Sequence, residues 1–321
     1  MADINPTTVA YPDEDLDGRQ PPPPGDDVTD DEAEGLSTEA RSFGRQTWDR
    51  FRRHRVAMAG ALGLVLLTAS FWIGPWWSDY EFSAPSADLR QSPSLEHPFG
   101  TDEIGRDLMV RTFTGGQFSI RIAVIVALVA TGVGTLFGAL AGYFGGWVDA
   151  VVGQLINLFL IIPPLVVLLV FAIRYGGGPT SIALLLAALL WTRIARVTRG
   201  LFLQFKEQEF VQAARAAGAK APRIIVRHIL PNTMGPVLVE MTLLVGTAII
   251  LESTLSFLGL GVNPPTPTLG TLIAQAKGNL TSRPSTLLIP GFFVTGIVLC
   301  INFLGDGLRD ALDPTSSRNR D

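Results

Sequence analysis

Long apolar runs recur along this chain from Val56 to near its C-terminal end, and polar or glycine-rich segments separate them. Six runs come close to the roughly 20 residues that a helix needs to cross the hydrocarbon core of a membrane. They cover residues 56–77, 119–142, 150–173, a stretch from after Pro179 to about Val197, 236–261 and 285–305. Backbone in lipid must satisfy its own hydrogen bonds, so each run is expected to be helical. The pattern therefore predicts an all-α integral membrane protein with six transmembrane helices.

Glycine and proline mark the ends of these runs and one bend. The sequence GYFGG at 142–146 ends the second run, and RYGGGP at 174–179 separates the third run from the fourth. Pro163 and Pro164 interrupt the third run and are expected to kink its helix. Kinked helices often line pathways, although a kink can equally serve packing.

Composition agrees with a membrane protein and sets the N-terminal region apart. Apolar residues make up 47% of the 321, more than a soluble domain needs to fill one core. Residues 1–40 hold twelve acids, one base and a PPPP run at 21–24, so they are expected to stay disordered. This tail is acidic and the first apolar run begins only at Val56, which argues against a signal peptide. It either binds a partner or is solvated filler.

Basic residues indicate the orientation, because short cytoplasmic loops keep Lys and Arg in excess. With the N-terminus inside, the inside segments hold 18 of the 25 bases, so both termini are expected in the cytoplasm. The extracytoplasmic loop is then 78–118, the five-helix core is 119–305 with its largest inside loop at 198–232, and the C-terminal tail is 306–321. The basic segment 41–55 is expected to anchor the first helix against anionic lipid rather than to bind nucleic acid.

Few residues offer chemistry of their own. Cys300 is the only cysteine, and the histidines His54, His97 and His228 include no i, i+4 pair of the kind that binds zinc on a helix. No metal site is therefore expected. The phosphate-binding pattern GxxxxGK[ST] is also missing from the sequence, so the chain is not expected to bind a nucleotide or any other cofactor.

The inside loop 198–232 reads as two short helices separated by a Gly/Ala/Pro bend. Apolar positions gather on one face and charged positions, Glu209 among them, on the other. Four alanines, Ala213, Ala214, Ala216 and Ala217, keep the first helix slim, and Gly218 permits a turn that a residue with a Cβ would resist. Such an element suits docking into a groove on another protein. The alternative is an ordinary interhelical loop.

The same loop resembles the EAA loop of ABC-importer permeases. That pattern runs Glu-Ala-Ala, three residues, Gly, nine residues, Ile, one residue, Leu-Pro. The matching positions here are Gln212, Ala213, Ala214, Gly218, Leu230 and Pro231, with Gln212 in place of Glu and His228 in place of Ile. The resemblance implies that the loop forms a coupling helix in a cleft of a separate ATP-binding subunit, with Glu209 and Ala217 also at that interface. ATP and Mg²⁺ would then be bound by the partner subunits.

Two further stretches narrow the family. The segment HPFGTDEIGRDLMVRTFTGGQFSI at 97–120 and the C-terminal third, with SFLGLGVNPPTPTLGTLI and GDGLRDALDP, resemble the dipeptide, oligopeptide and nickel permeases. The arrangement is similar to their C-type subunit. The resemblance implies a bacterial inner-membrane protein that pairs with a B-type permease, two ATP-binding subunits or domains, and an extracytoplasmic solute-binding protein. Peptide is the first choice of cargo and nickel the alternative.

Two polar residues are candidates for the translocation path. Glu252 is the only acid deep inside the fifth run, where a carboxylate costs several kcal/mol unless it faces water or a partner. It is expected either on the path, together with Asn157, or in a structural hydrogen bond to a neighbouring helix. Glu240 and Asp306 are placed near helix ends, where a charge costs little.

Several charged residues lie close to His97 in the sequence. Asp102, Glu103, Arg106, Asp107 and Arg111 are expected to form a self-satisfied charge network or to meet the solute-binding protein.

An intramembrane enzyme would need paired catalytic residues at one depth, which Asn157 and Glu252 alone do not supply. An ATP-independent channel or carrier is the second rival.

Overall fold

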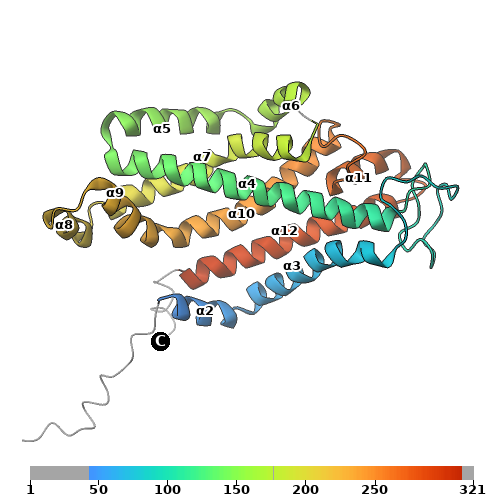
Figure 1. The fold of residues 1–321 in the computed structure, drawn as a ribbon, viewed down its shortest axis with the longest axis horizontal. Coiled ribbons are helices and arrows are strands. Elements are labelled where there is room, and N and C mark those ends of the chain that lie inside the picture. Colours follow the sequence, from blue (N-terminus) through green and yellow to red (C-terminus); the bar gives the residue numbers. More distant parts are fainter. Residues whose placement is uncertain (1–42, 176, 313–321) are drawn as a thin grey trace, which may run out of the picture. The chain divides into compact units, whose positions relative to one another are not determined.

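Helices are the main regular secondary structure in the part that the structure, a computed structural model, describes, residues 43–175 and 177–312 (Figure 1), and the longest stretch without a helix is the loop 78–107. The predicted acidic tail and the end of the predicted C-terminal tail lie outside these residues. The elements are α2 (Phe43–Arg53), α3 (Arg55–Ile73), the 3₁₀ turn η1 (Gly74–Trp77), α4 (Leu108–Phe144), α5 (Gly146–Ile161), α6 (Pro164–Tyr175), α7 (Pro179–Phe205), α8 (Glu209–Ala216), α9 (Ala221–Ile224), the π turn η2 (Ile225–Ile229), α10 (Leu230–Phe257), α11 (Leu269–Gln275), the 3₁₀ turn η3 (Ala276–Asn279) and α12 (Ser285–Leu312). The all-α prediction is confirmed.

The six predicted spans correspond to five long apolar helices and one bent pair. The long helices are α3 with η1, α4, α7, α9 to α10, and α12, each long and apolar enough to cross a membrane. The pair α5 and α6 meets at an angle of 87°, which fits either a broken span or a re-entrant loop. Ile162 joins them in an extended conformation, as expected for the residue before a proline. Pro163 and Pro164 thus mark a much sharper change of direction than a kink within one helix.

The second long helix begins eleven residues before the expected residue 119, so the end of the expected loop 78–118 is helical. The carboxylate of Asp107 caps this helix by accepting a 2.8 Å hydrogen bond from the backbone N–H of Val110. Arg111 lies in the first turn with its side chain buried. Hydropathy places the start of a membrane helix after such a charge. Here the charge is surrounded by protein rather than lipid, so the helix begins before it.

Other helix ends also differ from the expected positions. The helix expected to end near Val197 continues to Phe205 in α7, and the last helix continues past residue 305 to Leu312. The fifth span was expected at 236–261, but helical backbone begins at Ala221 and ends at Phe257. Hydropathy locates only the apolar middle of a helix, whereas the backbone stays helical where its side chains become charged. Of the two short helices predicted within 198–232, the first is the separate helix α8. The second is α9, which continues through η2 into α10.

Glycines allow α4 and α7 to pack closely, and the two helices lie side by side in Figure 1. A Cβ on Gly134 would lie 2.5 Å from the carbonyl oxygen of Trp191, and one on Gly138 would lie 2.5 Å from that of Ala195. Gly142, one turn further on, faces Phe202 in the same way. Small residues every fourth position commonly let membrane helices approach to backbone contact. The apolar core of the molecule surrounds this pair, with α10 and α12 packed against it.

Candidate functional site

A short segment from α8 to η2 joins the long helices α7 and α10 and contains the motif singled out in the sequence (Figure 1). Val211 anchors α8, because its side chain is completely buried. Its cluster includes Phe202 of α7, Ile224 of α9 and Ile229 of η2. One apolar side chain thus fixes α8 to the two helices on either side of it, as the predicted amphipathic pattern requires.

The turn after α8 is built on Gly218, which has φ +81°. The Gly218 N–H donates to the carbonyl oxygen of Arg215 at 3.0 Å, and the Ala219 N–H donates to that of Ala214 at 3.0 Å. These two bonds form a Schellman motif, the common way to end a helix on a left-handed residue. The predicted need for glycine at this position is confirmed. Pro222 then lies in the first turn of α9. The backbone N–H that proline lacks would have no partner within the helix at this position.

The outer face of α8 is slim and exposed. Glu209, Gln212, Ala213, Ala217 and Gly218 are exposed, and Ala214 is half-buried. Phe210 adds an aromatic ring with 40% of its surface accessible. Another protein can therefore approach the backbone of α8 closely while contacting one large apolar side chain.

The two positions that depart from the EAA pattern take part in local hydrogen bonds, Gln212 through its side chain and His228 through its backbone carbonyl. The Gln212 amide donates to the carbonyl oxygen of Glu207 at 3.0 Å, so it braces the entry to α8. His228 lies in the π turn η2, and the side chain of Asn232 donates to its carbonyl oxygen at 2.6 Å. Leu230 and Pro231, the end of the pattern, open α10, with Leu230 packed against the Val211 cluster. The structure thus brings the whole motif into one segment.

Glu252, a predicted path residue, is fully buried in α10. Its carboxylate accepts hydrogen bonds from the hydroxyl of Ser256 at 2.8 Å and from that of Thr268 at 2.7 Å. A longer contact of 3.4 Å comes from Ser119 on α4. These contacts are the structural bonds that the sequence left open as the alternative. A role for Glu252 on the path stays a prediction.

Asn157, the second predicted path residue, is exposed on α5. Its side-chain oxygen accepts a 3.3 Å hydrogen bond from Arg196 of α7. A second contact between these helices lies two turns earlier along α5 and one turn later along α7, where the Arg199 guanidinium pairs with both carboxylate oxygens of Asp149, the longer bond being 2.8 Å. Buried Glu252 and exposed Asn157 therefore have different partners and different surroundings.

Arg193 and Glu240 form an ion pair that the sequence did not indicate. Arg193 Nε lies 3.5 Å from Glu240 Oε2, joining α7 to α10. The expected position of Glu240 near a helix end is wrong, because the helix continues without a break from Ala221 to Phe257. Arg193 was counted with the inside loop for the same reason, although α7 extends twelve residues beyond it. A prediction that allowed charged residues inside a membrane helix would have placed both Arg193 and Glu240 within the spans.

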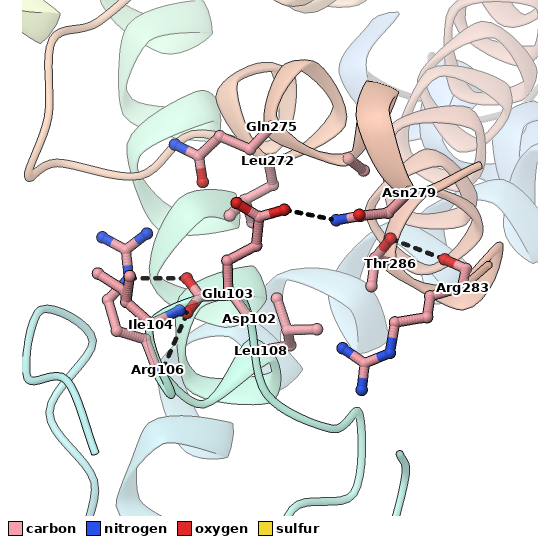
Figure 2. Close-up of a pocket in the computed structure, with 11 residues that line it drawn as sticks. Asp102, Glu103, Ile104, Arg106, Leu108, Leu272, Gln275, Asn279, Arg283 and Thr286 are labelled. Atoms are coloured by element: carbon pink, nitrogen blue, oxygen red, sulfur yellow. Dashed lines mark hydrogen bonds and ion pairs between the residues drawn. The ribbon is translucent and has the colours of Figure 1, made fainter. Parts of the chain in front are cut away.

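At the N-terminal end of α4, far from the α8 segment, charged side chains line a pocket of about 210 Å³ (Figure 2). Arg106 Nε donates to Asp102 Oδ2 at 2.7 Å, and Asn279 donates to Glu103 at 3.4 Å. The guanidinium of Arg283 donates to the carbonyl oxygen of Thr101 at 3.2 Å. The contacts of Asn279 and Arg283 fasten the loop before α4 to η3 and to the short segment between η3 and α12.

Buried Arg111 extends this network. It donates to the carbonyl oxygen of Phe82 at 3.2 Å and to the side chain of Gln275 at 3.0 Å. Its Nε lies 3.7 Å from Asp102 Oδ2. One side chain of α4 thus holds both the loop and α11.

The histidine of the same cluster is also internally paired. His97 Nδ1 lies 2.8 Å from Asp107 Oδ2, and its Nε2 lies 3.7 Å from Asp88. Next to the imidazole ring, the Tyr80 hydroxyl donates to Glu96 at 2.9 Å, which raises the pKa of the Tyr80 phenol. The self-satisfied network that the sequence favoured is therefore met only in part, because His97 Nε2 and Arg111 Nε are buried without a hydrogen-bond partner within the described residues. No group of three His, Cys, Asp or Glu side chains suited to a metal ion occurs within 43–175 and 177–312.

Comparison with known proteins gives a consistent result over nearly the whole chain. The sequence profile of the family described as "Binding-protein-dependent transport system inner membrane component" matches residues 134–318. A second profile, described as "N-terminal TM domain of oligopeptide transport permease C", matches residues 42–94. Outside both matches lie residues 1–41, 95–133 and 319–321, and the second of these segments contains the His97 cluster.

Two curated relatives are similar along most of their length. The oligopeptide transport system permease protein OppC of Bacillus subtilis is 37% identical over 284 residues, covering 88% of this chain and 93% of the relative. The dipeptide transport system permease protein DppC of the same organism is 38% identical over 295 residues, covering 89% and 90%. In both comparisons the aligned region accounts for nearly all of the relative.

A solved structure of the MetNI methionine ABC transporter, in an inward-facing conformation, shares the fold with a TM-score of 0.53. The match covers 64% of this chain and 96% of the solved chain at 19% identity. At that identity the likeness concerns the arrangement of helices only.

Proposed function

Because the chain belongs to the family of binding-protein-dependent transport system inner membrane components, we propose that it is one permease subunit of an ATP-driven peptide importer. In this role it supplies half of a translocation pore and moves with an ATPase that other subunits carry. The observation that carries the proposal is the exposed α8 segment. Its small residues and the left-handed turn at Gly218 have the positions that the EAA pattern requires.

The α8 segment supports the coupling role through its rigidity. Val211 fixes α8 to α7 and α9, and α9 continues into α10, so a displacement of α8 moves two long helices with it. Rigid levers of this kind convert closure of one protein into rocking of another. The proposed contact surface consists of Glu209, Gln212, Ala213, Ala214, Ala217 and Gly218, with Leu230 and Pro231 at the base of α10.

The proposed partners and orientation follow from the same elements. The α8 segment lies in the cytoplasm, where it meets two ATP-binding subunits or domains, and both chain termini lie on that side. A B-type permease completes the pore, and the loop 78–107 meets an extracytoplasmic solute-binding protein. The excess of Lys and Arg in the segments assigned to the cytoplasm supports this orientation in a bacterial inner membrane.

We assign no catalytic step to this chain. ATP and Mg²⁺ are bound by the partner subunits, and the contribution of the chain is mechanical. The sequence supports this division, since GxxxxGK[ST] does not occur in it.

Peptide is the proposed cargo. The two relatives described above are named for oligopeptide and dipeptide transport, and each aligns with more than four fifths of this chain. Nickel, the alternative expected from the sequence, has no comparable support.

Transport by a reconstituted complex tests the proposal. The chain, its partner permease, the ATP-binding subunits and the solute-binding protein are placed in liposomes with a labelled oligopeptide. Uptake should require ATP, the solute-binding protein and this chain together. Uptake by the chain alone, or uptake that continues without ATP, would show that it is a channel or carrier.

A further inference from the structure

Arg193 is exposed and its partner Glu240 is half-buried, although both lie in membrane-spanning helices. The distance between Arg193 Nε and Glu240 Oε2 is 3.5 Å, and the side chains are 52% and 25% accessible. Arg196, one turn further along α7, is also exposed, and its partner Asn157 is a neutral amide. This group of four residues is called the charged face below.

Helix length fixes the depth of this face in the membrane. The 27 residues of α7 span about 40 Å, whereas the hydrocarbon core is about 30 Å thick. Arg193 lies roughly 21 Å from the start of α7 and roughly 18 Å from its end, so a 30 Å core that lies wholly within the length of α7 includes it. Glu240 lies at the same depth because it contacts Arg193.

Helices α3, α4 and α12 pack against other sides of α7 and α10, so they do not cover the charged face, and α5 contacts it through Asn157. On α7, Thr192, Ile194 and Ala195 beside Arg193 are buried, and Gly134 and Gly138 of α4 contact this side. On α10, Leu238 lies at the depth of Glu240 but lines an apolar groove with side chains of α3, α4 and α12. The charged face therefore points away from the core.

Charged side chains at membrane depth almost always face a water-filled cavity or another charge, because lipid does not solvate them. We propose that the charged face lines the aqueous translocation path, where Arg193 and Arg196 contact carboxylates and Glu240 contacts ammonium groups of a passing peptide. The proposal rests on the proposed transport function and gives that path specific residues. A peptide carries both charge signs at its termini, which matches a face that offers both.

Solvent access at the charged face can be measured by thiol labelling in the assembled complex. Cys300 is the only cysteine, so a Cys300→Ala background accepts single cysteines in place of Arg193, Glu240 or Leu238, with cysteine-free partner subunits. A membrane-impermeant, charged thiosulfonate reagent should modify positions 193 and 240 at least about tenfold faster than position 238, since thiols in lipid do not ionise. Equal, slow rates at all three positions would overturn the proposal and indicate a dry contact with the second permease.

A second measurement separates contact with cargo from a structural ion pair. Peptides rich in Asp and peptides rich in Lys are compared, and each rate is normalised to the affinity of the solute-binding protein for that peptide. Arg193→Gln should slow the Asp-rich peptide about fivefold more than the Lys-rich one, and Glu240→Gln should do the reverse. Equal slowing of both peptides would contradict contact with cargo. Failure of the unchanged complex to transport either peptide would refute the proposed function, while the labelling result would stand by itself.

Discussion

The hydroxyl of Thr268 donates a 2.7 Å hydrogen bond to Glu252 Oε1, joining the start of α11 to the interior of α10. Thr268 is also the N-cap of α11, since its oxygen accepts from the backbone N–H of Thr271 at 3.1 Å. Ser119 of α4 completes the junction by accepting from the backbone N–H of Leu269 at 3.2 Å. One buried carboxylate therefore orders the meeting point of three helices.

Replacing Glu252 tests the strength of this junction. Glu252→Leu keeps the approximate volume but leaves the hydroxyls of Ser256 and Thr268 without their acceptor, which should cost about 1–3 kcal/mol. Glu252→Gln retains an acceptor oxygen and should cost less. Thermal unfolding of the purified complex would measure both variants. If the Leu variant melted with the unchanged protein, the hydrogen bonds would contribute nothing to stability.

The close approach of α4 and α7 gives a matched pair of glycine substitutions. Gly138→Ala places a methyl group 2.5 Å from the carbonyl oxygen of Ala195, so the helices must separate and stability should fall. Gly132, on the same helix, has no neighbour within 4 Å of an added Cβ, so Gly132→Ala should stabilise by about 0.5–1 kcal/mol. The melting temperatures should move in opposite directions. A melting temperature of the Gly138→Ala variant equal to or above that of the unchanged protein would show that Gly138 is not needed for close packing.

Much of this fold could be predicted from the sequence because lipid imposes simple rules. The approximate position of each span and a bend at Pro163 follow from apolar length and backbone geometry, and Gly218 follows from its turn, whereas the angle of 87° between α5 and α6 exceeds the expected kink. The helix ends could not be predicted. Arg111 and Glu240 are charges inside long helices, and only tertiary contacts with Gln275 and Arg193 show why the helix continues through them.

The candidate sites divide in the same way. The motif from Gln212 to Pro231 is local in sequence, so its spacing is visible without a structure. The charged face and the Glu252 junction join residues separated by up to 150 positions, and which of them meet depends on the register of packed helices. Glu252 was therefore singled out for its charge, whereas the exposed Arg193 was not.

The turn after α8 gives a second matched pair. Gly218→Ala forces an alanine into the left-handed region at φ +81°, which costs about 1–2 kcal/mol and should distort the end of the proposed contact surface. Gly200→Ala, in an ordinary helical position of α7 with no close neighbour, is the control. Binding of the ATP-binding subunits should weaken roughly tenfold for the first variant, by titration in detergent, and stay unchanged for the second. Equal affinities would mean that the turn does not shape the interface.

Protection of α8 by the ATP-binding subunits tests the central claim most directly. In the Cys300→Ala background, Ala217→Cys reports on α8, and Leu95→Cys, fully exposed in the loop before α4, is the control. Maleimide labelling is compared between the intact complex and membranes from which the ATP-binding subunits have been stripped. The account predicts that position 217 is labelled at least about tenfold more slowly in the intact complex, while position 95 is unaffected. Equal labelling of position 217 in both preparations would contradict it.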